Sequence, residues 1–431
     1  MHIYNYPSKS VGARLSAIVN RDLGFKKKDL LAVTRIIADV KKYGDKAVIK
    51  YVNRFDSPKL NIESLRVTPQ EWNSAAKNVN KSFTRALNRA YVQIAAFHKK
   101  QLSTSWINTQ RPGTILGQLV NPVDSAGVYV PGGQGGKTPL VSSVLMGAIP
   151  AKIAGVKQIS VVTPPTKDGT VNPHILAAAK KVGVDAVYKI GSAWAIAALA
   201  YGTGTIPKSN VIVGPGNIYV TLAKKILAGT VGIDIIAGPS EILVIADSSA
   251  TPEFIAADLL SQAEHDIFAS TVLVTTSKEL AKAVAAAVGK QLENLERKEI
   301  ARKSLDTYGA IMIVPDLAAA FEFANRIAPE HLELQIRNPF EYIGKIRNAG
   351  AVFIGNYTPE PVGDYVAGPN HVLPTAGTSR FASALCVDNF IKKTSLVYYS
   401  KEAFKRESAD IIRLAEIEGL DAHANSIKVR L

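Results

Sequence analysis

The sequence predicts an α/β protein built from two doubly wound, incomplete Rossmann-like parallel sheets, with small helical appendages at both ends. Two observations lead to this prediction. From about residue 125 onward, short β-branched runs alternate with Ala-rich helical segments, as in parallel sheets covered by helices. The strand runs are almost entirely apolar, which is typical of strands buried on both faces. Because the alternation occurs as two series, we expect two separate sheets.

The elements follow in chain order. Residues 28–54 and 69–103 place apolar residues at intervals of three and four, so both predict helices. The second begins after Thr68-Pro69, a helix-start signal. Residues 355–390 are rich in Gly and Pro and are expected to be irregular, whereas the last 40 residues are expected to be helical.

Two series of strands and helices lie between these ends. The first series has strands at 127–130, 159–163, 186–190 and 211–213, with helices at 139–154, 173–182, 193–201 and 217–228. The second series has strands at 242–246, 271–275, 310–314, 332–336 and 351–354, with helices at 252–265, 278–295 and 316–326.

The composition narrows the class of protein. With 431 residues, 47% hydrophobic and 20% charged, the chain can bury a full core, which excludes disordered and collagen-like proteins. One cysteine, Cys386, excludes a disulfide framework and a Cys-rich metal site, and its apolar surroundings predict a buried, inert thiol. No apolar run reaches the ~18 residues that a membrane-spanning helix needs, and no signal-peptide pattern is visible, so we expect a cytoplasmic protein without membrane association.

The net charge of +15 raises the possibility of a nucleic-acid binder. The basic residues are dispersed, however, and the longest run is only Lys26–Lys28. We therefore interpret the charge as a solvated basic surface and expect no nucleic-acid partner.

Three glycine-containing turns lie beside predicted strands. Residues 131–138 approach the phosphate-binding loop pattern, and Asp247 imitates its acidic strand, but Pro131 occupies the position of the first glycine. Proline supplies no N–H to an anion, which argues against a nucleoside triphosphatase. The turns at 213–217 and 237–241 leave room for a ligand at a sheet edge. Together the three turns indicate a cofactor or substrate crevice.

Several histidines lie close in sequence to oxygen donors. Gln262 and His265 share one helix face at i and i+3. Asp364 and His371 lie on one glycine-bent loop, and His423 follows Glu416 and Glu418 near the C-terminus. Imidazole with oxygen donors suits zinc or another divalent metal. A single histidine of this kind is usually structural, but the set favours a metal or acid–base site.

The pair Glu330-His331 is the candidate acid–base pair. Adjacent side chains diverge in a regular helix or strand, but the preceding Pro329 favours a turn on which they converge. A carboxylate and an imidazole there can remove an alcohol proton and activate a water. The alternative is a helix end whose histidine only caps carbonyl groups.

Beyond these local patterns, the chain resembles the histidinol dehydrogenase family over nearly its whole length. The stretches that carry the resemblance are GVYVPGG (127–133), SSVLMGAIPAKIAGV (142–156), AIAALAYGT (195–203), VGPGNIYVTLAKK (213–225), IDIIAGPSEILVIAD (233–247), DLLSQAEHD (258–266), APEHLEL (328–334), GNYTPEPVGDYVAGPNHVLPT (355–375) and AEIEGLDAHANS (415–426). The resemblance implies a zinc-dependent, NAD-linked oxidation of L-histidinol to L-histidine through a held aldehyde. A related zinc/NAD dehydrogenase for another polar alcohol is the alternative.

The resemblance also implies roles for particular residues. His331 would deprotonate the alcohol and Glu330 would activate water. The zinc ligands, which also contact substrate together with His331, would be Gln262, His265, Asp364 and His423. The further substrate-contacting positions would be Ser240, His371 and Glu418. Tyr129 and Asn217 would contact NAD, and Trp194 stands where the family typically has an NAD-contacting glutamine.

Finally, the resemblance implies a homodimer with shared active sites and a division of the chain into four parts. Residues 1–25 would be an N-terminal appendage, and 127–238 an inserted Rossmann-like domain on the NAD side. Residues 26–126 and 239–383 would form the discontinuous domain with most zinc and catalytic residues. The helical tail 384–431 would contribute to the partner's site.

Overall fold

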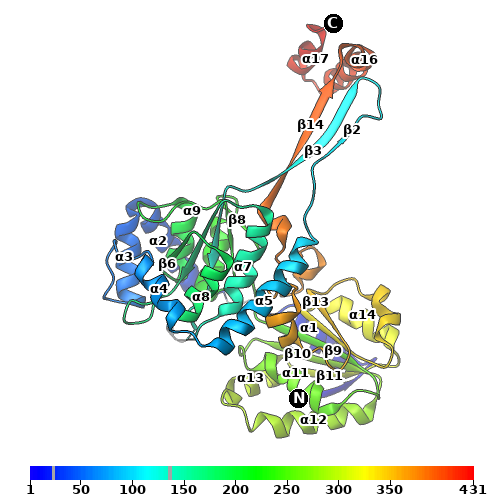
Figure 1. Ribbon diagram of the computed structural model, residues 1–431. Coiled ribbons are helices and arrows are strands. Elements are labelled where there is room, and N and C mark those ends of the chain that lie inside the picture. The colour runs from blue at the N-terminus through cyan, green and yellow to red at the C-terminus, as the bar shows by residue number, and fades with distance from the viewer. Residues whose placement is uncertain (22–24, 134–137) are drawn as a thin grey trace.

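A computed structural model describes residues 1–21, 25–133 and 138–431 (Figure 1). Two lobes, each built on a parallel sheet, lie side by side, and an antiparallel arm extends away from both. The predicted fold class is confirmed. The strand runs of both series form parallel sheets as expected, because their apolar residues are covered by helices on both faces.

The first lobe contains a six-stranded parallel sheet. Its strands, in spatial order, are β1 (Ile3–Asn5), β11 (Ala310–Ile313), β10 (Ser270–Thr275), β9 (Glu241–Ala246), β12 (His331–Gln335) and β13 (Ala351–Ile354). One face packs on α1 (Lys9–Val19) and α14 (Leu317–Ile327). The other face packs on α11 (Pro252–Ala263), α12 (Lys278–Leu292) and α13 (Lys298–Tyr308).

The second lobe contains a five-stranded parallel sheet. Its strands, in spatial order, are β6 (Ala186–Lys189), β5 (Gln158–Thr163), β4 (Ser125–Tyr129), β7 (Val211–Val213) and β8 (Gly232–Ile233). One face packs on α7 (Val141–Ala154) and α8 (Pro173–Val182), with α4 (Pro69–Lys77) and α5 (Lys81–Lys99). The other face packs on α9 (Ser192–Tyr201) and α10 (Ile218–Leu227), with α2 (Lys27–Tyr43) and α3 (Asp45–Tyr51).

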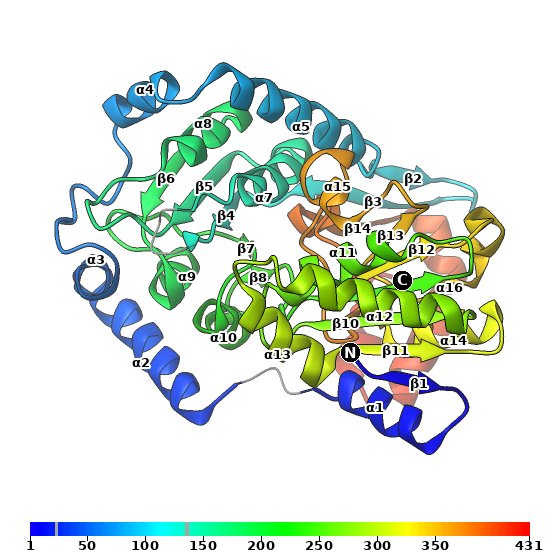
Figure 2. The ribbon, with the colours of Figure 1, turned by 90° about the horizontal axis from the view of Figure 1, so that it is seen from below.

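The N-terminal segments are therefore distributed differently from the expectation. The helices of residues 26–126 were grouped with the six-stranded sheet, but their apolar faces pack on the five-stranded one. Residues 1–25 were expected as a separate appendage, but β1 pairs with β11 and α1 packs beside it (Figure 2). The four domain borders themselves remain a prediction. Helix α4 begins as predicted, with a capping box between Thr68 and Glu71.

The arm corrects a second expectation. Residues 391–399 were predicted to be helical, but they form the strand β14 (Ile391–Tyr399). It pairs antiparallel with β3 (Thr114–Pro122), which also pairs with β2 (Trp106–Asn108). The helices α16 (Lys401–Ile417) and α17 (Asp421–Lys428) lie at the far end of this arm, away from both parallel sheets (Figure 1). Among the described residues, no helix has the length and apolar character needed to cross a membrane.

Candidate active site

The candidate acid–base pair lies at the amino end of β12. Ala328 has a positive φ of 53° and turns the chain after α14, so that Pro329 and Glu330 precede the strand and His331 begins it. Because β12 runs parallel to β9, with His331 opposite Ile242, the start of β9 lies beside the pair. Glu330 and His331 are both buried. The predicted turn therefore brings the two side chains into the same buried region.

Glu241, the first residue of β9, contacts both members of the pair. The Glu241 backbone N–H donates to Glu330 Oε2 at 3.0 Å, and the Glu330 N–H donates to Glu241 Oε2 at 3.1 Å. His331 Nδ1 lies 2.8 Å from the Glu241 carbonyl oxygen. A carbonyl only accepts, so the neutral ring carries its proton on Nδ1 and leaves Nε2 with the lone pair. Arg21 forms a buried ion pair with Glu241.

The alternation of β12 directs polar side chains toward α11. Leu332 and Leu334 pack in the core on one face of the sheet, so His331, Glu333 and Gln335 point to the other. Gln335 Nε2 donates to Asp258 Oδ2 at 2.8 Å and to Glu333 Oε2 at 3.1 Å. This stripe of buried polar groups runs from the candidate base into the layer between sheet and helix.

The loop after β13 completes the cluster. His331 Nε2 lies 3.9 Å from Glu360 Oε1, and His371 Nδ1 lies 3.8 Å from Asp364 Oδ1. One ligand atom each from His331, Glu360 and Asp364 lies within 4.8 Å of the others, a spacing that suits a metal ion. Buried Gln262 on α11 faces Glu360, and its side chain offsets part of the rise that burial causes in the pKa of that carboxyl. A cavity of about 410 Å³ lined by Asp364 and His371 opens beside the cluster.

Burial shapes the electrostatics of this cluster. Burial lowers the pKa of His331 to about 4, which keeps the ring neutral at pH 7. Burial and the adjacent charge of Glu241 raise the pKa of Glu330 well above its ordinary value. Burial and then Asp364 raise the pKa of Glu360 to about 8. Clustered carboxyl groups of this kind at a neutral imidazole are typical of acid–base or cation sites.

Two other predicted residues lie at the edge of the cluster. His265 follows α11 and is exposed, and it lies close enough to His331 to reinforce slightly the lowering of that residue's pKa that burial causes. Ser240 precedes β9, is half-buried, and its carbonyl accepts a hydrogen bond from the Ser270 N–H at 3.0 Å. Cys386 was expected to be buried, but it is half-exposed because it lines the cavity beside Asp364 and His371.

The second candidate site lies at the carboxyl ends of the five-stranded sheet. Tyr129 ends β4, Asn217 caps α10 after β7, and both line a cavity of about 720 Å³ together with Trp194 and Asp56. The Ser192 N–H donates to the Tyr129 hydroxyl at 3.2 Å. A Cβ at Gly214, where φ is 117°, would collide with the Tyr129 carbonyl oxygen, so the turn at 213–217 approaches β4 through glycine.

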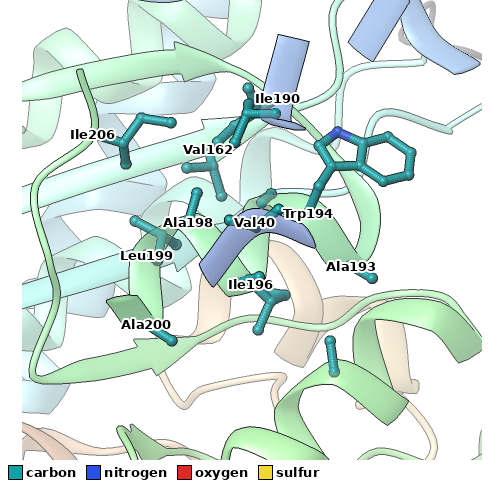
Figure 3. Packing of buried hydrophobic residues seen from close by; sticks show 14 of the residues in the cluster. Val40, Val162, Ile190, Ala193, Trp194, Ile196, Ala198, Leu199, Ala200 and Ile206 are labelled. Carbon is teal, nitrogen blue, oxygen red and sulfur yellow. The ribbon is translucent and has the colours of Figure 1, made fainter. Parts of the chain in front are cut away.

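Trp194 belongs to an aromatic stack at this cavity. Its ring lies 5.8 Å from that of Tyr51 and 5.6 Å from that of Phe55, with interplanar angles of 17° and 21°. Figure 3 shows the indole beside the buried residues of α9. Trp194 is 5% exposed, whereas Phe55 is 51% exposed and presents an aromatic surface to a planar ligand.

Comparison with known proteins identifies the family. The family model for histidinol dehydrogenase matches residues 22–431. The chain belongs to the histidinol dehydrogenase family. A histidinol dehydrogenase of Desulfotalea psychrophila is 54% identical over 400 residues, which cover 93% of this chain and 92% of that protein. One of Carboxydothermus hydrogenoformans is 53% identical over 399 residues, 93% of each chain. The crystal structure of histidinol dehydrogenase from Elizabethkingia anophelis covers 100% of this chain and 98% of its own, with 38% identity and a TM-score of 0.93.

Two of the predicted site residues of this oxidoreductase lie outside the cluster. Glu418 follows α16 and His423 lies on α17, both at the far end of the arm (Figure 1). Within one chain the structure therefore brings together Gln262, Asp364, His331 and Glu330, with His265 and His371 beside them, but not Glu418 or His423.

Several residues of the candidate site were not predicted from the sequence. Glu360 lies four residues before Asp364, a spacing that predicts a shared helical face. Glu241 directly follows Ser240, so the turn at 237–241 was a usable signal. Arg21 and Asp56 carry no local signal. The loop that resembles a phosphate-binding motif falls largely on residues 134–137, which lie outside the described residues. Asp247 instead accepts the Arg337 N–H at 3.0 Å.

Proposed function

We propose that the enzyme oxidises L-histidinol to L-histidine, the closing reaction of histidine biosynthesis, with zinc and NAD, in the cytoplasm. Conversion of a primary alcohol to a carboxylate removes four electrons, so it needs two hydride transfers, one added water, and bases to take up protons. The observation that supports the proposal is the juxtaposition, in a chain of this family, of the Glu330-His331 pair with the Glu360 and Asp364 carboxyl groups.

The residues present fit a zinc ion. The predicted ligands Gln262 and Asp364 lie in the cluster with a neutral imidazole, and amide, carboxylate and imidazole groups are donors that zinc accepts. Buried Gln262 places its amide group beside the Glu360 carboxyl, and the amide oxygen is the atom that zinc would accept. Gln262, His265 and Asp364 would hold the metal, with Glu360 beside them. Bound zinc supplies a Lewis-acidic anchor that orients the substrate.

The two bases act on different protons. His331 is neutral and presents the Nε2 lone pair toward the Glu360 side of the cluster, so Nε2 accepts the alcohol proton. Glu330 is buried with a raised pKa, which makes its carboxylate a stronger base for the water that adds to the aldehyde. The buried setting excludes bulk water from the held aldehyde.

The cavity at the five-stranded sheet fits part of a dinucleotide. Its volume of about 720 Å³ lies in the range of cofactor sites. Tyr129, Asn217 and the Phe55–Trp194 stack would hold it, and the N-terminus of α10 suits a pyrophosphate. Two NAD molecules, bound one after the other, would each accept one of the two hydrides. Trp194 replaces the glutamine of the family with an aromatic surface at the same place.

The arm supports a homodimer with shared sites. It carries Glu418 and His423 away from its own lobes, and it exposes large apolar side chains, including Ile417 at 74% and Val397 at 65%. Exposed apolar side chains in such number on an extended arm are typical of an interface. A partner's cluster would then receive both residues.

The test is the stoichiometry of NADH formation. Purified protein with limiting L-histidinol and excess NAD is expected to release two NADH per histidinol, measured by absorbance. A chelator should abolish the reaction and added Zn²⁺ should restore it. Zinc-loaded, folded protein that binds NAD but forms no NADH would contradict the substrate assignment and favour another polar alcohol. NAD binding is measured by the quenching of Trp fluorescence. Absence of NAD binding in this assay would contradict the cofactor assignment.

A further inference from the structure

Glu241 is buried at the centre of a network that joins four separate segments of the chain. Its Oε1 pairs with Arg21 and accepts the Ala376 N–H at 3.0 Å, and its Oε2 accepts the Glu330 N–H. We propose that Glu241 and Arg21 are positioning residues, which hold the Glu330 carboxyl and the His331 ring in the geometry that the reaction needs. This inference rests on the proposed function.

The first step of the argument is the fixed orientation of Glu330. The N–H groups of Glu241 and Glu330 each donate to the carboxylate of the other residue, at 3.0 and 3.1 Å. The Glu330 side chain therefore cannot rotate without breaking a buried hydrogen bond. Its Oε2 is engaged in this exchange, which leaves Oε1 for a reacting group. This reciprocal pair of hydrogen bonds therefore selects one rotamer of the Glu330 side chain, which has three torsions.

The second step is the orientation of the base. The Glu241 carbonyl oxygen accepts from His331 Nδ1, at 2.8 Å. The position of the Glu241 main chain thus decides both the tautomer and the direction of the ring. That main chain is held from both sides, because Pro239 O accepts from Arg21 at 3.1 Å and the Gly238 N–H donates to Thr375 Oγ1 at 2.5 Å. A shift of Glu241 would move both candidate bases together.

The third step is the need for a cation. Glu241 and Glu330 are two buried carboxyl groups in contact, and a buried charge is costly unless it is paired. Arg21 supplies the pairing charge, and its side chain is only 1% exposed. One nitrogen, Nη2, contacts both Glu241 Oε1 and Pro239 O, while Arg21 Nε has no partner among the described residues. The single ammonium group of a lysine can therefore replace the Arg21 nitrogen that makes these contacts.

The experiment compares four variants with the zinc-loaded wild-type enzyme. Arg21→Met removes the cation, Arg21→Lys keeps it, and Arg21→Met with Glu241→Gln removes both charges. Arg14→Met is the matched control, because Arg14 lies in the same N-terminal segment, bonds the Gly309 carbonyl at 2.6 Å and also has an unpartnered buried Nε. The measurements are kcat and KM for L-histidinol, and the thermal midpoint of each variant.

We expect Arg21→Met to lower kcat by about 100-fold, the effect of a misplacement near 1 Å, with KM changed by less than about threefold. Arg21→Lys should recover most of the lost kcat. The double variant should melt near the wild-type midpoint, since a buried ion pair replaced as a unit is often neutral in stability, yet keep the low kcat. Arg14→Met should lower the midpoint and leave kcat unchanged.

The outcomes separate this inference from the proposed function. Wild-type enzyme that forms no NADH from histidinol defeats the proposed function. If the wild type is active and the kcat of the double variant lies within about twofold of the wild-type kcat, the positioning role is overturned. If Arg21→Met does not fold, Arg21→Lys and the double variant decide the question alone. A kcat loss in Arg14→Met as large as in the double variant would also overturn the inference, because stability would then explain both.

Discussion

The two parallel sheets carry their candidate sites at opposite ends of their strands. The cavity with Tyr129 and Asn217 lies at the carboxyl ends of the five-stranded sheet, where open α/β sheets usually bind ligands. The cluster around Glu330 and His331 lies at the amino ends of β9 and β12 in the six-stranded sheet. A glycine turn leading into a helix suits phosphate binding. The start of a strand offers no helix terminus, so buried side chains must supply the chemistry there.

The two sites also differ in completeness. The cavity of the five-stranded sheet has its aromatic stack, its capping Asn217 and its glycine turn within one chain. The cluster of the six-stranded sheet lacks Glu418 and His423, which lie on the arm. If the proposed function holds, the folded subunit alone suffices for cofactor binding, whereas catalysis requires the assembled dimer. Three predictions test the contrast.

The largest effect is expected from mixed dimers. His423→Ala and Glu330→Gln should each lower activity by about 100-fold or more, because the first removes a proposed metal ligand and the second a proposed base. A heterodimer of the two variants, purified through different tags, should regain about half of the wild-type rate, since one of its two shared sites is intact. NADH formation measures the recovery.

A reciprocal heterodimer is the control for this experiment. Wild-type subunits paired with the double variant His423→Ala/Glu330→Gln contain no intact shared site, so this heterodimer should be inactive. If each chain instead used its own tail, the pattern would reverse: the first heterodimer would be inactive and the second about half active. That reversal would contradict the shared site.

Much of this molecule was predictable from sequence because the core pattern and the site pattern are local. The strands of both parallel sheets carry uninterrupted apolar runs, such as Ile242–Ala246, that only a doubly covered sheet explains. Gln262 and His265 lie three residues apart at the end of α11, although the helix ends at Ala263 and His265 follows it in a turn instead of sharing the predicted helix face. Pro329 marks the turn before Glu330. In each of these cases, neighbours in sequence supply the information.

The remainder depends on contacts between distant segments. Arg21 and Glu241 are 220 positions apart, and nothing near Arg21 in sequence indicates a buried partner. The strand β14 pairs with β3, and both of its faces are largely exposed, so its sequence lacks the alternation that announces a strand. The helices α2 and α3 carry apolar stripes that fit either sheet, so their own residues do not decide which sheet they cover. Their grouping with the six-stranded sheet came from the family resemblance, and it differs from the observed packing.

A medium effect is expected from breaking the buried ion pair of the five-stranded sheet. Lys224 pairs with Asp234 and donates to the Gly214 carbonyl at 3.0 Å, while the Gly214 N–H donates to Asp234 at 2.7 Å. Lys224→Met leaves Asp234 buried and unpaired, which should cost about 3–5 kcal/mol of stability. Because the pair clamps the turn at 213–217, NAD affinity should also fall. Thermal unfolding and quenching of Trp fluorescence by NAD measure the two effects.

The neighbouring Lys225→Met is the matched control, because Lys225 is exposed and contacts only the ring of Phe25 among the interactions described. It should leave the midpoint and the NAD affinity nearly unchanged. The comparison with Arg21→Met is the sharper test. The Lys224–Asp234 pair holds the turn at 213–217, and the Arg21–Glu241 pair holds the turn at 237–241. Lys224→Met should therefore act on NAD affinity, and Arg21→Met on kcat. Loss of kcat at saturating NAD in Lys224→Met would break the division between the sheets.

The smallest effect is expected from Asp56, the carboxyl group at the apolar cavity. Burial raises its pKa from 3.8 to about 7, although Lys167 and the indole of Trp194 act in the opposite direction. Between those pH values the unfolded chain is ionised at this residue while the folded chain stays protonated, so wild-type stability falls as pH rises from 3.8 to about 7. Asp56→Asn does not titrate. Its thermal midpoint should therefore match the wild type near pH 4 and exceed it by a few degrees at pH 8.

The exposed Asp168 provides the opposite case on the same lobe. Its side chain bonds Lys59 at 2.7 Å, which lowers its pKa, so Asp168→Asn should not raise the midpoint at any pH. A gain in the thermal midpoint of Asp56→Asn that does not change with pH would mean that the Asp56 carboxyl is hydrated or paired in the folded protein. The cavity would then not be the water-free apolar surface on which the proposed aromatic recognition of the cofactor depends. A gain that grows up to pH 7 would instead show that this lobe carries the Asp56 carboxyl against an energetic penalty. The buried carboxyl groups of Glu241 and Asp234, by contrast, each have a basic partner, Arg21 in the six-stranded sheet and Lys224 in the five-stranded one.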